Sequence, residues 1–447
     1  MRIRCLSSAL SLALFASPGC YLAHERPASG SHPSDDVGPR SRDGRVPSED
    51  AGTRSRDGRV PSEDVGRVEG RDGGVATCVP TVPDPTVDLL IMIDNSSSMR
   101  EHQIQLRDQL PRMIATLVTG MRDASHGGPF VPPRSLHIGV VSSTMGLGPV
   151  AGVPGCPPGF GDDGILFTHS PFPQTPCTAM DFSAMYPHGV FEFQQGQVSP
   201  SAAQFSSDVS CVAVLGTGGC GLEFELEPVL KALAPEPDAS GVSSVSWTAP
   251  GYMPPTFYGN TFGHGSDPAT NGGFLRSDSV LAILTLCDED DGSTDQYPIF
   301  TNDPQYSSVA LNVRPVAFAA SLYPVSRYIE GLIGLRRAPS MLVFSEITGI
   351  PNDLSPTPGT EADLAAILAD PRMQPMIDPA HPERLVPVCA DTSGGQTAVP
   401  GFRMVQVADG LRQLGASVNV HSICQNDFTP AIDDVIARVA GALCVGP

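Results

Sequence analysis

The chain has 447 residues, and 40% of them are hydrophobic, which is enough for packed domains and excludes a wholly disordered protein. The formal net charge is −21, and residues 75–447 hold 16 basic and 37 acidic residues. An acidic surface of this kind repels phosphate backbones, so nucleic acid is not expected as a partner, whereas divalent cations or basic ligands are. After the N-terminus, no apolar run approaches the ~20 residues that a transmembrane helix requires.

The N-terminus has the pattern of a secretory signal peptide. Residues 1–4 are Met-Arg-Ile-Arg, residues 5–16 form a short apolar stretch, and small residues follow. The stretch is too short to span a membrane, and polar sequence follows it directly. We therefore predict a signal over residues 1–20 rather than a buried N-terminal helix.

The end of this segment resembles the cleavage site of bacterial lipoproteins. Gly19-Cys20 stands at the expected position, although Ser17 replaces the Leu that such signals favour. The resemblance implies that Cys20 is lipidated. Because Tyr21 rather than Asp follows, it also implies an exported, outer-membrane lipoprotein that faces the periplasm or the cell surface and contacts the membrane through its lipid anchor.

Three 14-residue repeats fill residues 33–74, and the first of them reads PSDDVGPRSRDGRV. Each repeat has one or two valines and no aromatic residue, so it cannot bury a core, and its period is too short for a solenoid. We predict that residues 21–77 form a disordered tether and residues 78–447 the folded domain. A peptide-recognition array is the alternative for the repeats.

The most informative stretch is an apolar run, residues 87–93, that ends in Asp94 and continues as Asp94-x-Ser96-x-Ser98. Apolar spacing over residues 100–121 then predicts a helix. One carboxylate and two hydroxyls in a strand-to-helix turn suit a hard divalent cation, Mg²⁺ or alternatively Mn²⁺ or Ca²⁺. Ser98 with Glu101 also fits a helix capping box, and both interpretations can hold together.

Further apolar runs predict a sheet whose strands alternate with helices. The expected strands are 136–143, 280–288, 340–347 and 416–423, and the expected helices are 222–234, 325–335, 405–414 and 431–443. Alternation of this kind is typical of a mostly parallel α/β sheet. Long segments without such patterns indicate insertions at about 144–200, 238–278 and 350–400.

The Asp-x-Ser-x-Ser sequence after the first strand resembles the metal-ion-dependent adhesion site of von Willebrand factor type A domains, and the resemblance covers roughly residues 87–444. It implies a doubly wound, Rossmann-like, six-stranded, mostly parallel sheet flanked by helices. It also implies a set of metal-site residues, namely Asp94, Ser96, Ser98, Thr217 and Asp288.

Residues 216–221 also contain G-x-G-x-x-G, the dinucleotide-binding pattern, which requires a preceding strand. Phe205, Val209 and Val212 instead recur at helical spacing, so a nucleotide site is not favoured. The acidic run 289–291, with Asp295, does not fit the EF-hand spacing. We predict a solvated acidic loop there.

Nine cysteines remain once Cys5 and Cys20 are set aside, and most should be paired in an exported protein. No Cys-x-x-Cys occurs, which argues against zinc. Sequence does not determine connectivity. The pairs we favour are Cys156–Cys177, Cys211–Cys220, Cys78–Cys444 and Cys389–Cys424, with Cys287 unpaired in a buried strand.

Neither H-E-x-x-H nor G-x-S-x-G occurs, and no local spacing singles out a nucleophile with its base. We therefore expect a binding protein and not an enzyme. The resemblance implies surface-tethered, metal-dependent adhesion, in which a carboxylate of a protein ligand completes the coordination of the metal. The alternatives are a metal-free type A scaffold, an exported hydrolase with its chemistry in the insertions, and a dinucleotide-dependent enzyme.

Overall fold

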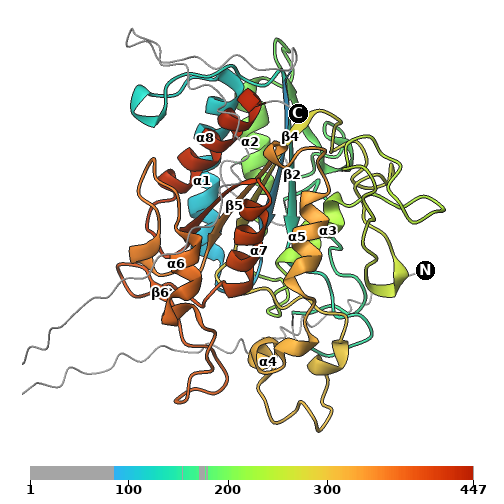
Figure 1. Cartoon of the computed structure of the whole chain (residues 1–447), viewed down its shortest axis with the longest axis vertical. Helices are drawn as coiled ribbons and strands as arrows, with labels where there is room; N and C mark the ends of the chain where they lie inside the picture. Colours follow the sequence, from blue (N-terminus) through green and yellow to red (C-terminus); the bar gives the residue numbers. More distant parts are fainter. Residues whose placement is uncertain (1–84, 154, 171–176, 178–179, 446–447) are drawn as a thin grey trace, which may run out of the picture. The chain divides into compact units, whose positions relative to one another are not determined.

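Buried apolar segments pair as parallel strands at the centre of the computed structural model (Figure 1). The structure describes residues 85–445 apart from 154, 171–176 and 178–179. Central parallel strands are covered on both faces, which is why their sequences are continuous apolar runs. The five parallel strands are β1 (Thr86–Ile93), β2 (Ser135–Ser142), β4 (Ser279–Leu286), β5 (Leu342–Thr348) and β8 (Ser417–Ser422).

A sixth strand, β3 (Phe191–Gln194), pairs antiparallel with β2 at one edge, and the order is β3-β2-β1-β4-β5-β8. The prediction of a mostly parallel six-stranded α/β sheet is thereby confirmed. The sequence did not locate β3, which lies inside the predicted insertion 144–200. A four-residue edge strand is too short to produce a clear periodic pattern.

Helices cover both faces of this sheet (Figure 1). On one face, α1 (Arg100–Thr119) packs against α2 (Ala202–Val212) and α8 (Thr429–Val445). On the other face, α5 (Val325–Ile333) packs against α3 (Leu226–Leu233) and α7 (Phe402–Gln413). The remaining α-helices and strands of the described residues are short: α4 (Arg314–Ala317), α6 (Leu364–Ala369), and the small sheet of β6 (Cys389–Ala390) with β7 (Thr397–Ala398). Among the described residues, no helix has the length and apolarity needed to cross a membrane.

Two helix starts differ from the sequence expectations. The capping box at Ser98 does not form, because the residue that precedes α1 is Met99 and no side chain caps the helix. The Ser98 hydroxyl instead lies 3.2 Å from the Ser96 hydroxyl. The predicted helix 222–234 begins only at Leu226, because the four residues before it form a loop beside the strand ends.

The disulfides correct two of the predicted pairings. Cys389–Cys424 is confirmed, and Cys287 is buried and unpaired, as expected. The other bonds are Cys156–Cys220 and Cys177–Cys211, not Cys156–Cys177 and Cys211–Cys220. The cause lies in the tertiary structure, because Cys211 sits on α2, whereas Cys220 belongs to a small apolar cluster that also contains Cys156.

Several predictions fall outside the described residues. They are the signal peptide, Cys20 with its lipid, the repeated tether and Cys78. Cys444 is disulfide-bonded, and its pairing with Cys78 stays a prediction.

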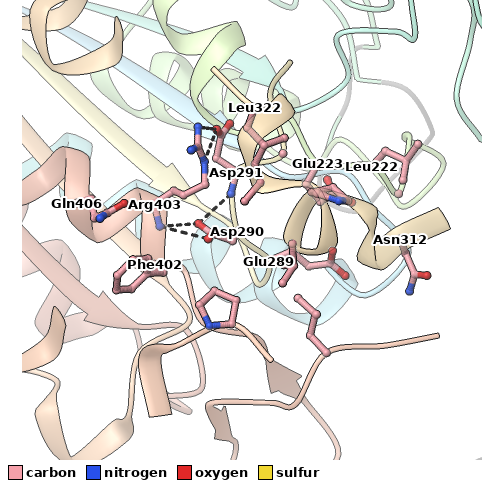
Figure 2. Close-up of a pocket in the computed structure, with 17 residues that line it drawn as sticks. Leu222, Glu223, Glu289, Asp290, Asp291, Asn312, Leu322, Phe402, Arg403 and Gln406 are labelled. Atoms are coloured by element: carbon pink, nitrogen blue, oxygen red, sulfur yellow. Dashed lines mark hydrogen bonds and ion pairs between the residues drawn. The ribbon is translucent and has the colours of Figure 1, made fainter. Parts of the chain in front are cut away.

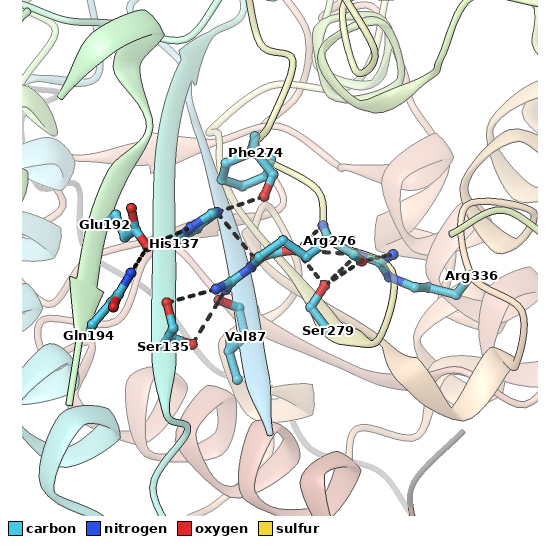
Figure 3. Close-up of polar contacts among 10 residues, drawn as sticks. Val87, Ser135, His137, Glu192, Gln194, Phe274, Arg276, Ser279 and Arg336 are labelled. Carbon is cyan, nitrogen blue, oxygen red and sulfur yellow. Dashed lines mark hydrogen bonds and ion pairs between the residues drawn. The ribbon is translucent and has the colours of Figure 1, made fainter. Parts of the chain in front are cut away.

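An ion network surrounds Asp88 of β1, which is fully buried. Its carboxylate accepts hydrogen bonds from the backbone and side-chain nitrogens of Arg276, both at 2.8 Å, and from the Ser279 hydroxyl. The guanidinium of Arg336, also fully buried, lies 3.6 Å from the carboxylate and donates to Ser279 at 2.9 Å. Arg276 also donates to the Ser135 hydroxyl at 2.7 Å, so the network joins β1, β2 and β4 to the turn that follows α5 (Figure 3).

Candidate metal centre

The sheet topology brings Asp94 and Asp288 together. Asp94 directly follows β1, and Asp288 lies two residues after the end of β4, the parallel neighbour of β1. The Asp94 amide donates to the Leu286 carbonyl at 2.9 Å. The next strand along the chain, β2, lies on one side of β1, and β4 lies on the other side. Ligand sites in open α/β sheets form at such switch points, outside the carboxyl ends of the strands.

Four of the five predicted residues meet there. The Asp94 carboxylate accepts hydrogen bonds from the Ser96 amide at 2.7 Å and from the Ser96 hydroxyl at 3.0 Å. Asp94 and Ser98 both act on the pKa of the Asp288 carboxyl: the Asp94 charge raises it and Ser98 lowers it, so the three side chains share one site. Asp94, Ser96 and Asp288 are buried, whereas Ser98 is exposed, so the cluster opens to the surface on the Ser98 side.

Thr217, the fifth predicted residue, is exposed, and none of the hydrogen bonds among the described residues joins it to Asp94. From the same loop, the Gly219 amide donates to the carbonyl of Asn95, the residue after Asp94, at 2.9 Å. A Cβ atom on Gly219 would lie 2.0 Å from the Asn95 side-chain oxygen, so only glycine fits this contact.

Two carboxylates that the sequence analysis missed complete the cluster. Glu223 and Glu225 each place an oxygen within 4.8 Å of the other and of an Asp94 oxygen. Along residues 222–225, successive side chains point to opposite sides of the chain. Leu222 and Phe224 pack into the small apolar cluster around the Cys156–Cys220 disulfide. The acids therefore point the other way, toward Asp94. The signal in the sequence is the alternation Glu-Phe-Glu-Leu-Glu at 223–227, which lies within the predicted helix 222–234.

Four carboxylate oxygens of this cluster lack partners. Both oxygens of Glu225, one of Glu223 and one of Asp288 are buried without a hydrogen-bond partner among the described residues. Burial raises the pKa of Glu223, Glu225 and Asp288 well above the ordinary values, and the charge of Asp94 raises each of them further. Buried charges without partners are costly, and a cation would satisfy them. The donor set, which consists only of oxygen, fits a hard divalent ion.

Side chains around the cluster hold its loops in place. The Gln103 amide nitrogen of α1 donates to the Asp94 carbonyl at 2.8 Å and to the Gly216 carbonyl at 2.9 Å. Its amide oxygen accepts from the Gly216 amide at 3.0 Å. The Ser143 hydroxyl, which follows β2, lies 3.3 Å from carboxylate oxygens of both Asp94 and Glu223. The loops after β1, β2 and α2 are thus fixed relative to one another.

The acidic run after Asp288 is not the solvated loop that we predicted. The Asp290 carboxylate accepts from the Arg403 amide at 2.9 Å, at the start of α7. Asp291 is buried and accepts from the Arg403 guanidinium at 3.0 Å and from the Leu226 amide at 3.0 Å. These two acids hold α7 and α3 in place, and the sequence could not reveal it because Arg403 is more than 100 residues away.

The glycine-rich segment 216–221 follows helix α2, as the apolar spacing before it predicted, so a helix and not a strand directly precedes it. The structural context of a dinucleotide site is therefore missing. No protein-family model matches the chain, and a search of curated proteins finds no significant match.

Proposed function

We propose that the domain binds a divalent cation at Asp94, Ser96, Ser98 and Asp288, with Glu223 and Glu225 beside them, and that it binds a protein ligand through this cation. The observation that carries the proposal is the group of buried carboxylate oxygens without partners around Asp94. Asp94, Ser96, Ser98 and Asp288 lie together after neighbouring strands, and this supports the resemblance to the metal site of type A domains. The implied ion is Mg²⁺, with Mn²⁺ and Ca²⁺ as the alternatives.

The exposed Ser98 side is the path by which a ligand group would reach the cation. The resemblance implies a carboxylate there. The signal and the tether, with a lipid on Cys20, would present the domain at an outer-membrane surface, which suits adhesion.

The negative charge of the carboxylate cluster limits which protein ligands can bind beside the cation. Four carboxylates, those of Asp94, Glu223, Glu225 and Asp288, outnumber the two charges of one cation, and no basic side chain forms an ion pair with them among the described residues. Affinity for a hard cation rises with the number of charged ligands, so the ion should be held firmly. A ligand that brings positive charge together with its carboxylate would meet less repulsion.

Thermal unfolding of the purified protein tests the proposal. We expect Mg²⁺, Mn²⁺ or Ca²⁺ to raise the melting temperature above its value in chelator, because an ion at one hundred times its Kd adds about 2.7 kcal/mol of stability. Asp94→Asn should abolish this shift, since Asp94 lies at the centre of the donor set.

Asp108→Asn is the matched control, because Asp108 is an exposed residue of α1 away from the cluster, and its shift should equal that of the wild type. A protein whose melting temperature is the same in chelator and in all three metals would contradict the proposal and leave a metal-free scaffold.

A further inference from the structure

A cavity of about 350 Å³ lies directly beside the candidate metal centre and is lined in part by Glu223 (Figure 2). Glu223 and Glu289 stand on one side of it, and Phe402 and Gln406 of α7 stand on the other. The cavity is therefore adjacent to the cation site but is formed largely by other segments. A volume at the small end of the range for ligand pockets suits one long side chain rather than a large cofactor.

Most of the wall is apolar. It comes from the loop before α3, from the segment between β4 and α5, from the insertion before α7, and from α7 itself. The apolar lining residues are Leu222, Pro315, Val316, Ala319, Leu322, Pro375, Leu385 and Phe402. Such a wall gains free energy by covering an apolar stem, at roughly 25 cal/mol per Å² of buried apolar surface.

The charged part of the wall is acidic and only partly compensated. Arg403 is the one basic residue that lines the cavity, and its guanidinium is engaged by Asp291 at 3.0 Å and by the Tyr323 carbonyl at 2.7 Å. The Asp290 carboxylate accepts a hydrogen bond from the backbone amide of Arg403, at the start of α7. Glu289 has no hydrogen bond or ion pair among the described residues, and Glu223, which is only 4% exposed, keeps one buried oxygen unpartnered.

We propose that this cavity binds the ammonium or guanidinium group of a lysine or arginine side chain of the protein ligand. The apolar wall covers the stem, and Glu289 and Glu223 accept hydrogen bonds from the charged end. A charge-assisted hydrogen bond is about twice as strong as a neutral one, so the acids select a cation over a neutral group of the same shape. The inference rests on the proposed function and extends it. The same protein ligand would offer a carboxylate to the metal and a lysine or arginine side chain to the cavity beside it.

A pair of probes of nearly equal shape tests this. Binding of pentylammonium and of 1-pentanol to the Mg²⁺-loaded protein is measured by titration calorimetry at pH 8, where an alkylammonium group keeps its proton. We expect pentylammonium to bind at least about tenfold more tightly than 1-pentanol, which corresponds to about 1.4 kcal/mol. Glu289→Gln should remove most of this preference, whereas the exposed, remote Glu361→Gln should keep it.

A second variant tests the cavity by reducing its volume and leaves its charged residues unchanged. Ala319→Phe places a ring in the cavity and should weaken pentylammonium binding while the Mg²⁺-induced rise in melting temperature remains. Equal affinities for the amine and the alcohol, or an undiminished preference in Glu289→Gln, would overturn the inference. Binding of a second equivalent of Mn²⁺ that displaces pentylammonium would assign the cavity to a metal and overturn it as well.

Different results would overturn the metal-dependent function and the binding of a basic side chain in the cavity. A protein that binds pentylammonium but shows no stabilisation by any divalent ion would retain the cavity and lose the metal-dependent function. A protein that is stabilised by Mg²⁺ but does not distinguish the two probes would retain the metal centre and lose the basic ligand group.

Discussion

Glu225→Gln is expected to stabilise the protein in chelator by about 3 kcal/mol and to weaken its binding of Mg²⁺, two effects of opposite sign. Glu225 is fully buried, neither of its oxygens has a partner among the described residues, and the acids around it are Asp94, Asp288, Asp291 and Glu289. An uncompensated buried charge typically costs several kcal/mol, and a glutamine removes it without changing the shape of the side chain. Urea unfolding in chelator and in Mg²⁺ measures both effects.

The adjacent acid on the other side of Leu226 is the matched control. Glu227 is also buried, but its carboxylate accepts from the Arg327 guanidinium at 2.8 and 3.0 Å and from the Tyr328 hydroxyl at 3.0 Å. Glu227→Gln should therefore destabilise the protein in chelator and in Mg²⁺ alike. If Glu225→Gln also destabilises the protein in chelator, the interpretation of Glu225 as an uncompensated acid beside a cation site is wrong.

The same carboxylates give the chelated protein a characteristic pH dependence. Burial raises the folded-state pKa of Glu225 well above its ordinary value of 4.5 and raises that of Glu289 to about 7. The folded state therefore binds more protons than the unfolded state above pH 4.5, so stability falls as the pH rises from about 5 to 8. Each group contributes about 1.4 kcal/mol per unit of pKa shift. Melting temperatures across this range should fall in chelator, and less steeply in Mg²⁺ or in Glu225→Gln.

Asp88→Asn is expected to lower the free energy of unfolding by about 3–5 kcal/mol, with or without metal. The substitution removes the only acid that forms ion pairs with Arg276 and Arg336 in the described structure, and Arg336 is fully buried. The cost arises mainly because the fully buried Arg336 and the partly buried Arg276, whose side chain is 22% exposed, lose their counter-charge. Urea unfolding measures it.

Asp353→Asn is the control for this prediction, because Asp353 pairs with Arg372 at 2.8 Å on the surface. Exposed ion pairs are screened by water and salt, so this change should alter stability little. Equal effects of the two substitutions would show that the Asp88 network does not stabilise the fold.

The sequence determined the elements that follow local rules. The apolar runs before Asp94 and before Asp288 identified two central strands, because a strand covered on both faces contains apolar residues throughout. The spacing of Asp94, Ser96 and Ser98 in a strand-to-helix turn identified one half of the candidate site in the same way. These signals depend on residues that are close together in the chain, so no tertiary information was needed.

The tertiary structure decided what depends on distant segments. Glu223 and Glu225 face Asp94 only because Leu222 and Phe224 pack into the cluster around Cys156. The acids after Asp288 support α7 because Arg403 folds back on them, and Asp88 is paired with Arg276 from 188 residues away. An acidic residue has the same local pattern whether it faces water, a cation or an arginine. Its role is fixed only when packing determines which groups share its buried surroundings.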